Sequence, residues 1–301
     1  LCLFTRAQLR QQQGIGRAYR ARKGETFARA EFGQVHEGAV RNTNTKHPKP
    51  SGVGCAGSIL ECHIFMSTAP FQLPPAAAGA ARHLALLPCA GLGSRAGTTG
   101  PKQYHMLAGQ PMVAHTLLAL AAVGFDAGLL VLAPGDAGVG VGLPPGFVQQ
   151  ACGGPTRADS VLSGLDALAL AGAHANDWVL VHDAARCLVD PADVLRLMRA
   201  CEHDPVGGLL AVPLADTLKA ADTDATGAPR SSATLARGGK WLAQTPQMFR
   251  LGLLSDALHA ARERGFEHIT DEASAVEALG LKPRLVPGNP MNFKLTYPAD
   301  F

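Results

Sequence analysis

From His83 onward, short apolar runs alternate with longer segments in which apolar residues repeat at helical spacing. Such short runs are typical of strands buried on both faces, and their alternation with helices is typical of a parallel sheet. The expected strands are Leu84–Leu87, Ala127–Leu132, Phe147–Ala151, Trp178–His182, Leu209–Val212, Pro283–Val286 and Asn292–Thr296. The expected helices are Gln110–Val123, Arg157–Ala171, Ala192–Cys201, Leu251–Gly265 and Asp271–Gly280. The pattern predicts an α/β fold with a mostly parallel sheet flanked by helices.

Two parts of the chain depart from this rhythm. Small and polar residues with a Gly-Gly pair fill Asp222–Gly239, which predicts a loop or hairpin arm within about 215–243. Residues 1–80 are expected to be a disordered or non-native extension, and residues 81–301 the folded domain. Because the first methionine is Met66, translation is expected to begin there. The rival interpretation is an organelle transit peptide, since the segment is rich in Arg and poor in acids.

Composition narrows the class of protein. Hydrophobic residues make up 47% of the 301 residues, which suits a packed core, and the apolar stretches are too short or too broken to cross a bilayer. The net charge is +3, but residues 1–65 carry ten Lys or Arg against four Glu, so the basic character belongs to that end. That segment lacks any nucleic-acid-binding module, so no nucleic-acid partner is expected. Because the apolar stretches are too short or too broken to span a bilayer, no membrane partner is expected either.

The seven cysteines are scattered without C-x-x-C pairs or a histidine at ligand spacing. This argues against a zinc site and against a disulfide framework. We expect free thiols in a reducing compartment, hence a cytoplasmic protein, or a plastid protein if the front segment is a transit peptide.

The most informative stretch is Leu84–Arg95 followed by Gly100-Pro-Lys102. The first expected strand runs into small residues whose backbone amides can surround phosphates without a side chain in the way. Arg95 and Lys102 add positive charge beside the same loop, which suits a triphosphate whose α-phosphorus gains negative charge during attack.

Other phosphate loops fit less well. A dinucleotide fold requires G-x-G-x-x-G and an acid after the second strand, but here the third glycine is displaced to Gly97 and that strand ends Leu132-Ala-Pro134. A Walker loop requires Gly-Lys-Ser/Thr, but Gly239-Lys240 is followed by Trp241. The remaining alternative, a glycine turn that only joins strand to helix, leaves Arg95 and Pro101-Lys102 unexplained.

Several short blocks, in one order along the chain, give it a family resemblance. They are Leu87-Pro-Cys-Ala-Gly-Leu-Gly-Ser-Arg95 with Pro101-Lys-Gln-Tyr104; Gly153-Gly-Pro-Thr-Arg-Ala-Asp-Ser-Val161; Val181-His-Asp-Ala-Ala-Arg186; Asp216-Thr217 with Lys219; Thr245-Pro-Gln247; Ile269-Thr-Asp-Glu-Ala-Ser274; and Asn292-Phe-Lys-Leu-Thr296. Together they resemble the signature of the 2-C-methyl-D-erythritol 4-phosphate cytidylyltransferases. The resemblance covers about Leu84–Phe301 and implies a Rossmann-like α/β fold with a projecting dimerisation arm. It implies a nucleotidyltransferase of the non-mevalonate isoprenoid pathway, which joins CMP from CTP to a methylerythritol phosphate and releases pyrophosphate.

The resemblance also implies roles at the nucleotide. Arg95 and Lys102 would stabilise the α-phosphorus as catalytic residues. The positions expected to bind CTP are Pro88, Cys89, Ala90, Gly91, Leu92, Gly93, Gly153, Gly154, Arg157, Ser160, Asp183, Ala184 and Ala185. For Ser160 the alternative is a helix-cap hydroxyl.

Asp183 follows a buried strand at its C-terminal end, the usual place for ligands in open α/β sheets. The resemblance implies that it holds Mg²⁺, or another divalent cation, directly or through water, and one carboxylate is sufficient because Mg²⁺ keeps several waters. The alternative is a plain loop acid. The neighbouring His182 is expected to point to the opposite face of the strand and to belong to the core.

For the second substrate the resemblance implies Arg237 and Lys294 as catalytic residues that position its phosphate. It adds Arg186, Thr217, Thr245 and Thr270 as substrate-binding residues. Related arms cross a twofold axis, so Thr217 and Arg237 are expected to serve the partner's site in a homodimer. No general base with a shifted pKa is expected, because a phosphate monoester is already ionised at neutral pH.

Three departures from the family pattern stand out. Cys187 replaces a usual proline, Cys89 replaces a small alanine, and the chain stops at Phe301 where relatives continue into a closing helix, so that helix is expected to be missing. The alternatives left open are a cytidylyltransferase for another polyol phosphate such as ribitol 5-phosphate, an NAD-dependent oxidoreductase, and a non-catalytic nucleotide-binding protein.

Overall fold

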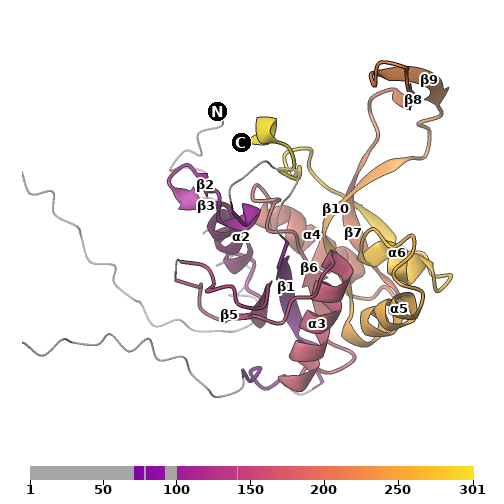
Figure 1. The fold of residues 1–301 in the computed structure, drawn as a ribbon. Helices are drawn as coiled ribbons and strands as arrows, with labels where there is room; N and C mark the ends of the chain where they lie inside the picture. Colours follow the sequence, from indigo (N-terminus) through magenta and orange to yellow (C-terminus); the bar gives the residue numbers. More distant parts are fainter. Residues whose placement is uncertain (1–70, 78, 92–99, 141) are drawn as a thin grey trace, which may run out of the picture.

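A seven-stranded sheet forms the centre of the computed structural model, which describes residues 71–77, 79–91, 100–140 and 142–301. The strand order is β11-β7-β10-β6-β1-β4-β5 (Figure 1). These strands span Arg284–Pro287, Gly207–Pro213, Trp241–Arg250, Trp178–Val181, His83–Cys89, Ala127–Leu132 and Phe147–Gln150, in that order. Their pairings are parallel except for the two made by β10. The predicted mostly parallel sheet is therefore confirmed.

Helices cover both faces of the sheet (Figure 1). Apolar residues of α2 (Met112–Ala121) and α4 (Pro191–Cys201) pack on one face, and those of α3 (Arg157–Leu170), α5 (Leu251–Glu263) and α6 (Glu272–Glu277) pack on the other. Along β1, alternate side chains enter the two cores, because successive residues of a strand point to opposite faces. The carboxyl ends of β1 and β6 thus emerge between two packed layers of helices.

Local sequence fixes where the helices begin. Thr156 caps α3 with a reciprocal bond to Asp159, and the Asp190 side chain accepts from the Ala192 amide at the start of α4. The expected helix at Gln110–Val123 starts later, at Met112, because Gln110–Pro111 pairs with Met106–Leu107 in a short hairpin, β2 and β3. Upstream of the expected domain start at residue 81, the partly buried Phe71 and Leu73 also pack against the core.

Strand β10 was not predicted. Its residues include Pro246 and several polar side chains, a pattern that argues against a central strand because proline cannot donate to the ladder. The register of its pairing with β7 shifts between Ala243 and Gln247, so the proline falls in an irregular stretch without a regular ladder bond. Beyond it the strand pairs with both β6 and β7, and its inner residues are buried.

The expected strand at Asn292–Thr296 was wrong. This segment runs as irregular backbone, in which the Leu295 amide donates to the Ala185 carbonyl at 3.0 Å and the Arg186 guanidinium donates to the Asn292 carbonyl at 2.7 Å. Its partners are therefore a loop and a side chain, and its residues cross the end of the sheet instead of extending it.

The predicted arm is a hairpin. Strands β8 (Leu218–Thr223) and β9 (Pro229–Leu235) pair with each other and stand away from the body of the domain (Figure 1). Every residue of β9 is exposed. Among the helices in the described ranges, none has the length and apolar character required to cross a membrane.

Pairing of β7 with β10 requires glycine at position 207. Gly207 has φ +107° and a Cβ there would collide with the Met248 carbonyl oxygen of β10. Gly207→Ala should lower the free energy of unfolding by about 3 kcal/mol or more, through strain plus overpacking. The control Gly227→Ala has φ +83° in open space within the arm and should cost about 1 kcal/mol. Equal losses in urea denaturation of the two variants would contradict this packing.

Candidate active site

A cavity of about 260 Å³ opens at the carboxyl ends of β1 and β6. This is where an open α/β sheet presents its loops, and helix α3 begins beside it. The described residues that line it are Pro88, Cys89, Ala90, Gly91, Lys102, Gln103, Met112, Gly154, Pro155, Thr156, Arg157, Ser160, Asp183, Ala184, Ala185 and Lys294. The turn after β1, the start of α3 and the end of β6 thus meet around one space, and Lys102, Gln103, Met112 and Lys294 complete its lining.

Most residues expected at a nucleotide line this cavity, with four exceptions. Leu92, Gly93 and Arg95 lie outside the described residues. Gly153 lies behind the wall, where its amide donates to the Leu132 carbonyl at 2.8 Å and a Cβ would meet the Cβ of Ala90. Glycine at 153 therefore permits close backbone packing under the loop, and Gly154 forms the surface.

The Ser160 hydroxyl bonds to the turn that precedes its helix. It accepts from the Gly154 amide at 3.2 Å and donates to the Thr156 carbonyl at 2.9 Å. The helix cap is Thr156, so the cap alternative considered for Ser160 does not hold. The hydroxyl instead fixes the shape of the glycine turn that forms one wall of the cavity.

Lys102 reaches the cavity from a short 3-10 turn that is tied to β1. The neighbouring Gln103, which is buried, donates its side-chain amide to the Cys89 carbonyl at 2.6 Å. The Tyr104 hydroxyl bonds to the Asp136 carboxylate at 2.9 Å, and the Lys102 ammonium donates to the Leu295 carbonyl. Burial, with Asp183 and Asp136 nearby, raises the pKa of Cys89 to about 12, so this thiol adds no negative charge beside the loop.

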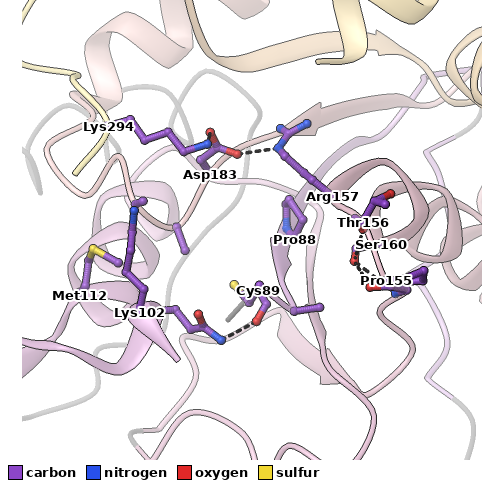
Figure 2. Close-up of a pocket in the computed structure, with 16 residues that line it drawn as sticks. Pro88, Cys89, Lys102, Met112, Pro155, Thr156, Arg157, Ser160, Asp183 and Lys294 are labelled. Carbon is purple, nitrogen blue, oxygen red and sulfur yellow. Dashed lines mark hydrogen bonds and ion pairs between the residues drawn. The ribbon is translucent and has the colours of Figure 1, made fainter. Parts of the chain in front are cut away.

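Asp183 lies between two cations at the boundary of the cavity (Figure 2). Its Oδ1 accepts from Arg157 Nε at 2.9 Å, and its Oδ2 lies 2.8 Å from Lys294 Nζ. The Asp183 side chain is 10% exposed. Burial favours the neutral acid, but the charges of Arg157 and Lys294 outweigh it and hold the pKa of Asp183 well below its ordinary value. The Asp183 carboxylate is therefore ionised, and it forms ion pairs with both Arg157 and Lys294.

A second hollow of about 160 Å³ adjoins the first, and Arg157, Asp183 and Lys294 line both. Its remaining described lining is Arg186, Ala243, Gln244, Thr245, Gln247, Thr270 and Asp271. The residues expected to bind the second substrate on the body of the domain, Arg186, Thr245, Thr270 and Lys294, thus come together from four parts of the chain.

Thr245 bonds internally as well as lining the second hollow. Its Oγ1 accepts from the Asp183 amide at 3.1 Å and lies 2.9 Å from His182 Nδ1. His182 is fully buried, and its Nε2 lies 3.2 Å from the Arg186 carbonyl oxygen. Burial lowers the pKa of His182 to about 4, so the ring is neutral, and it accepts from Thr245 and donates to Arg186. His182 is therefore a core residue, as expected, and it fixes the backbone behind Asp183.

Arg186 faces the second hollow from beside Asp183. Its Nε lies 3.9 Å from Asp183 Oδ2, and its other nitrogens donate to the carbonyls of Asn292 at 2.7 Å and Ala243 at 3.2 Å. Burial lowers the pKa of Arg186 from its ordinary value. The guanidinium remains a cation and is fixed by backbone carbonyls.

Two predicted residues lie away from both hollows. Thr217 and Arg237 are exposed near the ends of the arm hairpin, where Arg237 donates to the Ala215 carbonyl. Within one chain, the structure does not bring them to Asp183.

The described lining of the first cavity contains too few acidic side chains to coordinate a metal ion with protein ligands alone. Asp183 is the single acidic residue among those described around the first cavity, and both its oxygens contact cations. Across the described ranges, no three His, Cys, Asp or Glu side chains gather as a metal-binding group. One carboxylate fits a magnesium ion whose remaining ligands are phosphate oxygens and water.

The four cysteines in the described part of the chain, Cys89, Cys152, Cys187 and Cys201, are free thiols.

Sequence reasoning missed several contributors. Gln103, Met112, Pro155 and Thr156 line the first cavity without having been singled out. Glu272, inside the 269–274 block, contacts Arg157, which only the folded chain reveals. The blocks were the available signal for Gln103, Pro155, Thr156 and Glu272, which lie within them, whereas Met112 lies outside every block.

Comparison with known proteins identifies the family to which the chain is similar. The family model for 2-C-methyl-D-erythritol 4-phosphate cytidylyltransferase, IspD, matches residues 83–301. A protein of that name from Azoarcus sp. is 52% identical over 224 residues, which are 73% of this chain and 91% of that protein. The bifunctional enzyme IspD/IspF of Albidiferax ferrireducens is 58% identical over 220 residues, and the match covers 72% of this chain and 50% of that longer protein.

Solved structures share the fold. A crystal structure of 4-diphosphocytidyl-2C-methyl-D-erythritol synthase has a TM-score of 0.61 at 38% identity, with 73% of this chain and 95% of that chain covered. The 2-C-methyl-D-erythritol 4-phosphate cytidylyltransferase of Thermus thermophilus has a TM-score of 0.60 at 32% identity, with the same coverage of 73% and 95%.

Two threonines of the second hollow should respond differently to loss of the hydroxyl. Thr245→Val leaves the Asp183 amide and His182 without their partner, so the free energy of unfolding should fall by about 1–3 kcal/mol. Thr270→Val, at an exposed site, should change it by less than about 0.5 kcal/mol. Chemical denaturation measures both. A Thr245→Val protein as stable as the Thr270→Val protein would contradict the bonding described for His182.

Proposed function

The chain belongs to the 2-C-methyl-D-erythritol 4-phosphate cytidylyltransferase family, and on that premise we propose how its own residues carry out the transfer. The reaction joins CMP from CTP to 2-C-methyl-D-erythritol 4-phosphate and gives 4-diphosphocytidyl-2-C-methyl-D-erythritol and pyrophosphate. The observation that carries this proposal is the pair of adjoining hollows with a shared wall of Arg157, Asp183 and Lys294. Two substrates in neighbouring spaces can meet at that wall.

CTP occupies the first cavity. The backbone of Cys89–Gly91 faces the triphosphate, since small residues leave room for phosphate oxygens. Gly154, Arg157 and Ser160 form the wall for the base and sugar. Lys102, with Arg95 from outside the described residues, neutralises the charge that grows on the α-phosphorus, and preorganised donors of this kind each contribute roughly 3 kcal/mol.

The methylerythritol phosphate occupies the second hollow. Arg186 and Lys294 hold its phosphate beside the shared wall, and Thr270 adds a hydroxyl. Its phosphate oxygen then attacks the α-phosphorus in line with the leaving pyrophosphate. Positioning and charge neutralisation supply the catalysis, and the neutral, buried His182 takes no part as a base.

Magnesium is the cofactor we propose. It would lie on the triphosphate with Asp183 as the protein ligand, through water while Arg157 and Lys294 occupy the carboxylate oxygens. Its chemistry is neutralisation of the phosphate charges.

We further propose a homodimer in which the arm enters the partner's site. Leu235, Trp241 and Leu242 lie on the arm or at its base and are exposed by 44%, 38% and 52%. Exposed apolar groups of this kind are typical of surfaces that another chain covers. Thr217 and Arg237 would reach the partner's second hollow from that arm.

Pyrophosphate release tests the function directly. With CTP and magnesium, the protein should turn over 2-C-methyl-D-erythritol 4-phosphate at a kcat/KM at least about tenfold above that for ribitol 5-phosphate. Lys102→Ala should lower kcat by roughly 100- to 1,000-fold, whereas Lys282→Ala, at an exposed lysine outside the site, should leave kcat unchanged. Preference for ribitol 5-phosphate would identify the alternative polyol enzyme, and tight CTP binding without turnover would identify a nucleotide-binding protein.

Mixed dimers test the shared site. Co-expression of Arg237→Ala and Lys102→Ala subunits should restore about a quarter of wild-type activity, because half of randomly paired dimers contain one intact site. Each variant alone should stay nearly inactive. Recovery no greater than the sum of the two homodimers, or a fully active monomer in native mass spectrometry, would refute the shared arrangement.

A further inference from the structure

Glu272 is a buried acid beside the wall that the two hollows share. It is the first residue of α6, and it is 1% exposed. The 269–274 block was singled out for Thr270, an exposed residue, whereas the buried acid two positions later contacts the shared wall of the two hollows.

The contact uses the whole guanidinium of Arg157. Glu272 Oε1 accepts from Nη1 at 2.6 Å and Oε2 accepts from Nη2 at 3.1 Å, so the pair is bidentate. The remaining nitrogen, Nε, donates to Asp183 Oδ1 at 2.9 Å. All three nitrogens of one side chain therefore have anionic partners, and the two acids determine how the planar group lies.

Charge explains why both acids are required. Burial lowers the pKa of Arg157, but the charges of Asp183 and Glu272 outweigh this and raise it above its ordinary value. Without Glu272, Nη1 and Nη2 of the guanidinium would lose these acceptors, and the group would be free to rotate away. Arg157 Nε would then leave Asp183, which Figure 2 shows between Arg157 and Lys294.

The support behind Glu272 is itself rigid. Asp271 caps α6 through a reciprocal bond with Ser274. The Gln247 side chain, 1% exposed, donates to Asp271 Oδ2 at 2.8 Å and accepts from the Ala273 amide at 2.7 Å. Gln247 lies on β10 opposite Val181 of β6, two residues before Asp183. Both ends of the Glu272–Arg157–Asp183 chain are thus attached to neighbouring central strands.

We propose that Glu272 is a positioning residue of the transfer reaction. It holds the Arg157 guanidinium so that Nε stays on Asp183, and the wall between the nucleotide and acceptor hollows thereby keeps its shape. This inference rests on the proposed function of those hollows. A purely structural acid would only favour the first turn of α6 through the helix dipole, and would act on stability alone.

The first test is steady-state kinetics of Glu272→Gln. Because Arg157 faces CTP, KM for CTP should rise roughly tenfold and kcat/KM should fall about 100-fold, the usual loss when a partner that orients a site residue is removed. Glu272→Asp, which keeps the charge on a shorter side chain, should recover about tenfold of that loss. Glu277→Gln, the same change at the exposed end of the same helix, should match wild type. Loss of folded protein would lower kcat without raising KM, so unchanged KM in Glu272→Gln would overturn the proposal.

A double-mutant cycle tests the route through Arg157. If Glu272 acts only by holding Arg157, the double variant Glu272→Gln/Arg157→Gln should be no worse than Arg157→Gln. Losses that multiply would overturn the proposal.

A crystal structure of Glu272→Gln measures the distance between Arg157 Nε and Asp183 independently of activity. Arg157 Nε should lie beyond hydrogen-bond distance of Asp183, and an unchanged contact would refute the proposal even if the wild-type protein were inert. Should Glu272→Gln not fold, a crystal structure of Glu272→Asp should show the Arg157 Nε–Asp183 contact lengthened from 2.9 Å, and a contact of unchanged length would refute the proposal. A wild-type protein inactive with CTP and every acceptor would refute the proposed function, and the displacement of Arg157 would still be measured.

Discussion

The organisation of this protein's site depends on one buried carboxylate held between cations. Asp183 lies between Arg157 and Lys294 at the end of β6, with Arg186 close by. Because the Asp183 carboxylate is buried, loss of a cation beside it would leave its negative charge less compensated, so the positions of these side chains depend on one another. Arg157, Asp183 and Lys294 line both hollows, and it is at this wall that we propose the two anionic substrates approach one another.

The fold delivers these side chains from distant segments. Arg157 begins α3, Asp183 follows β6, and Lys294 comes from the irregular segment that crosses the end of the sheet. The antiparallel strand β10 lies between β6 and β7 and places Thr245 behind Asp183 and Gln247 beneath α6. A strand inserted against the parallel direction thus provides both the backbone support of the carboxylate and the attachment of Glu272.

The sequence allowed good prediction of the features that depend on local pattern. The apolar run Ala127–Leu132 is a strand with those bounds, because a strand buried on both faces consists of consecutive apolar residues. The turn after β1, which contains Gly91, lines the main cavity, and its small residues are visible in the sequence. Strand β10 was missed since Pro246 argues against a central strand unless the register shift is known. Asn292–Thr296 resembles a strand locally, but its bonds go to Ala185 and Arg186, which are far away in the sequence. The partners of Arg157 were unpredictable for the same reason: an ion pair 115 residues apart has no local signature.

The central claim is that the nucleotide lies at the carboxyl ends of β1 and β6, against the wall formed by Arg157, Asp183 and Lys294. A crystal structure with a non-hydrolysable CTP analogue and magnesium tests it most directly. The triphosphate should lie over Cys89–Gly91 within reach of Lys102, with the base near Gly154 and Ser160, and the Arg157–Asp183 contact should be preserved. A nucleotide bound at the opposite edge of the sheet, or an Asp183 separated from Arg157 in the complex, would contradict it.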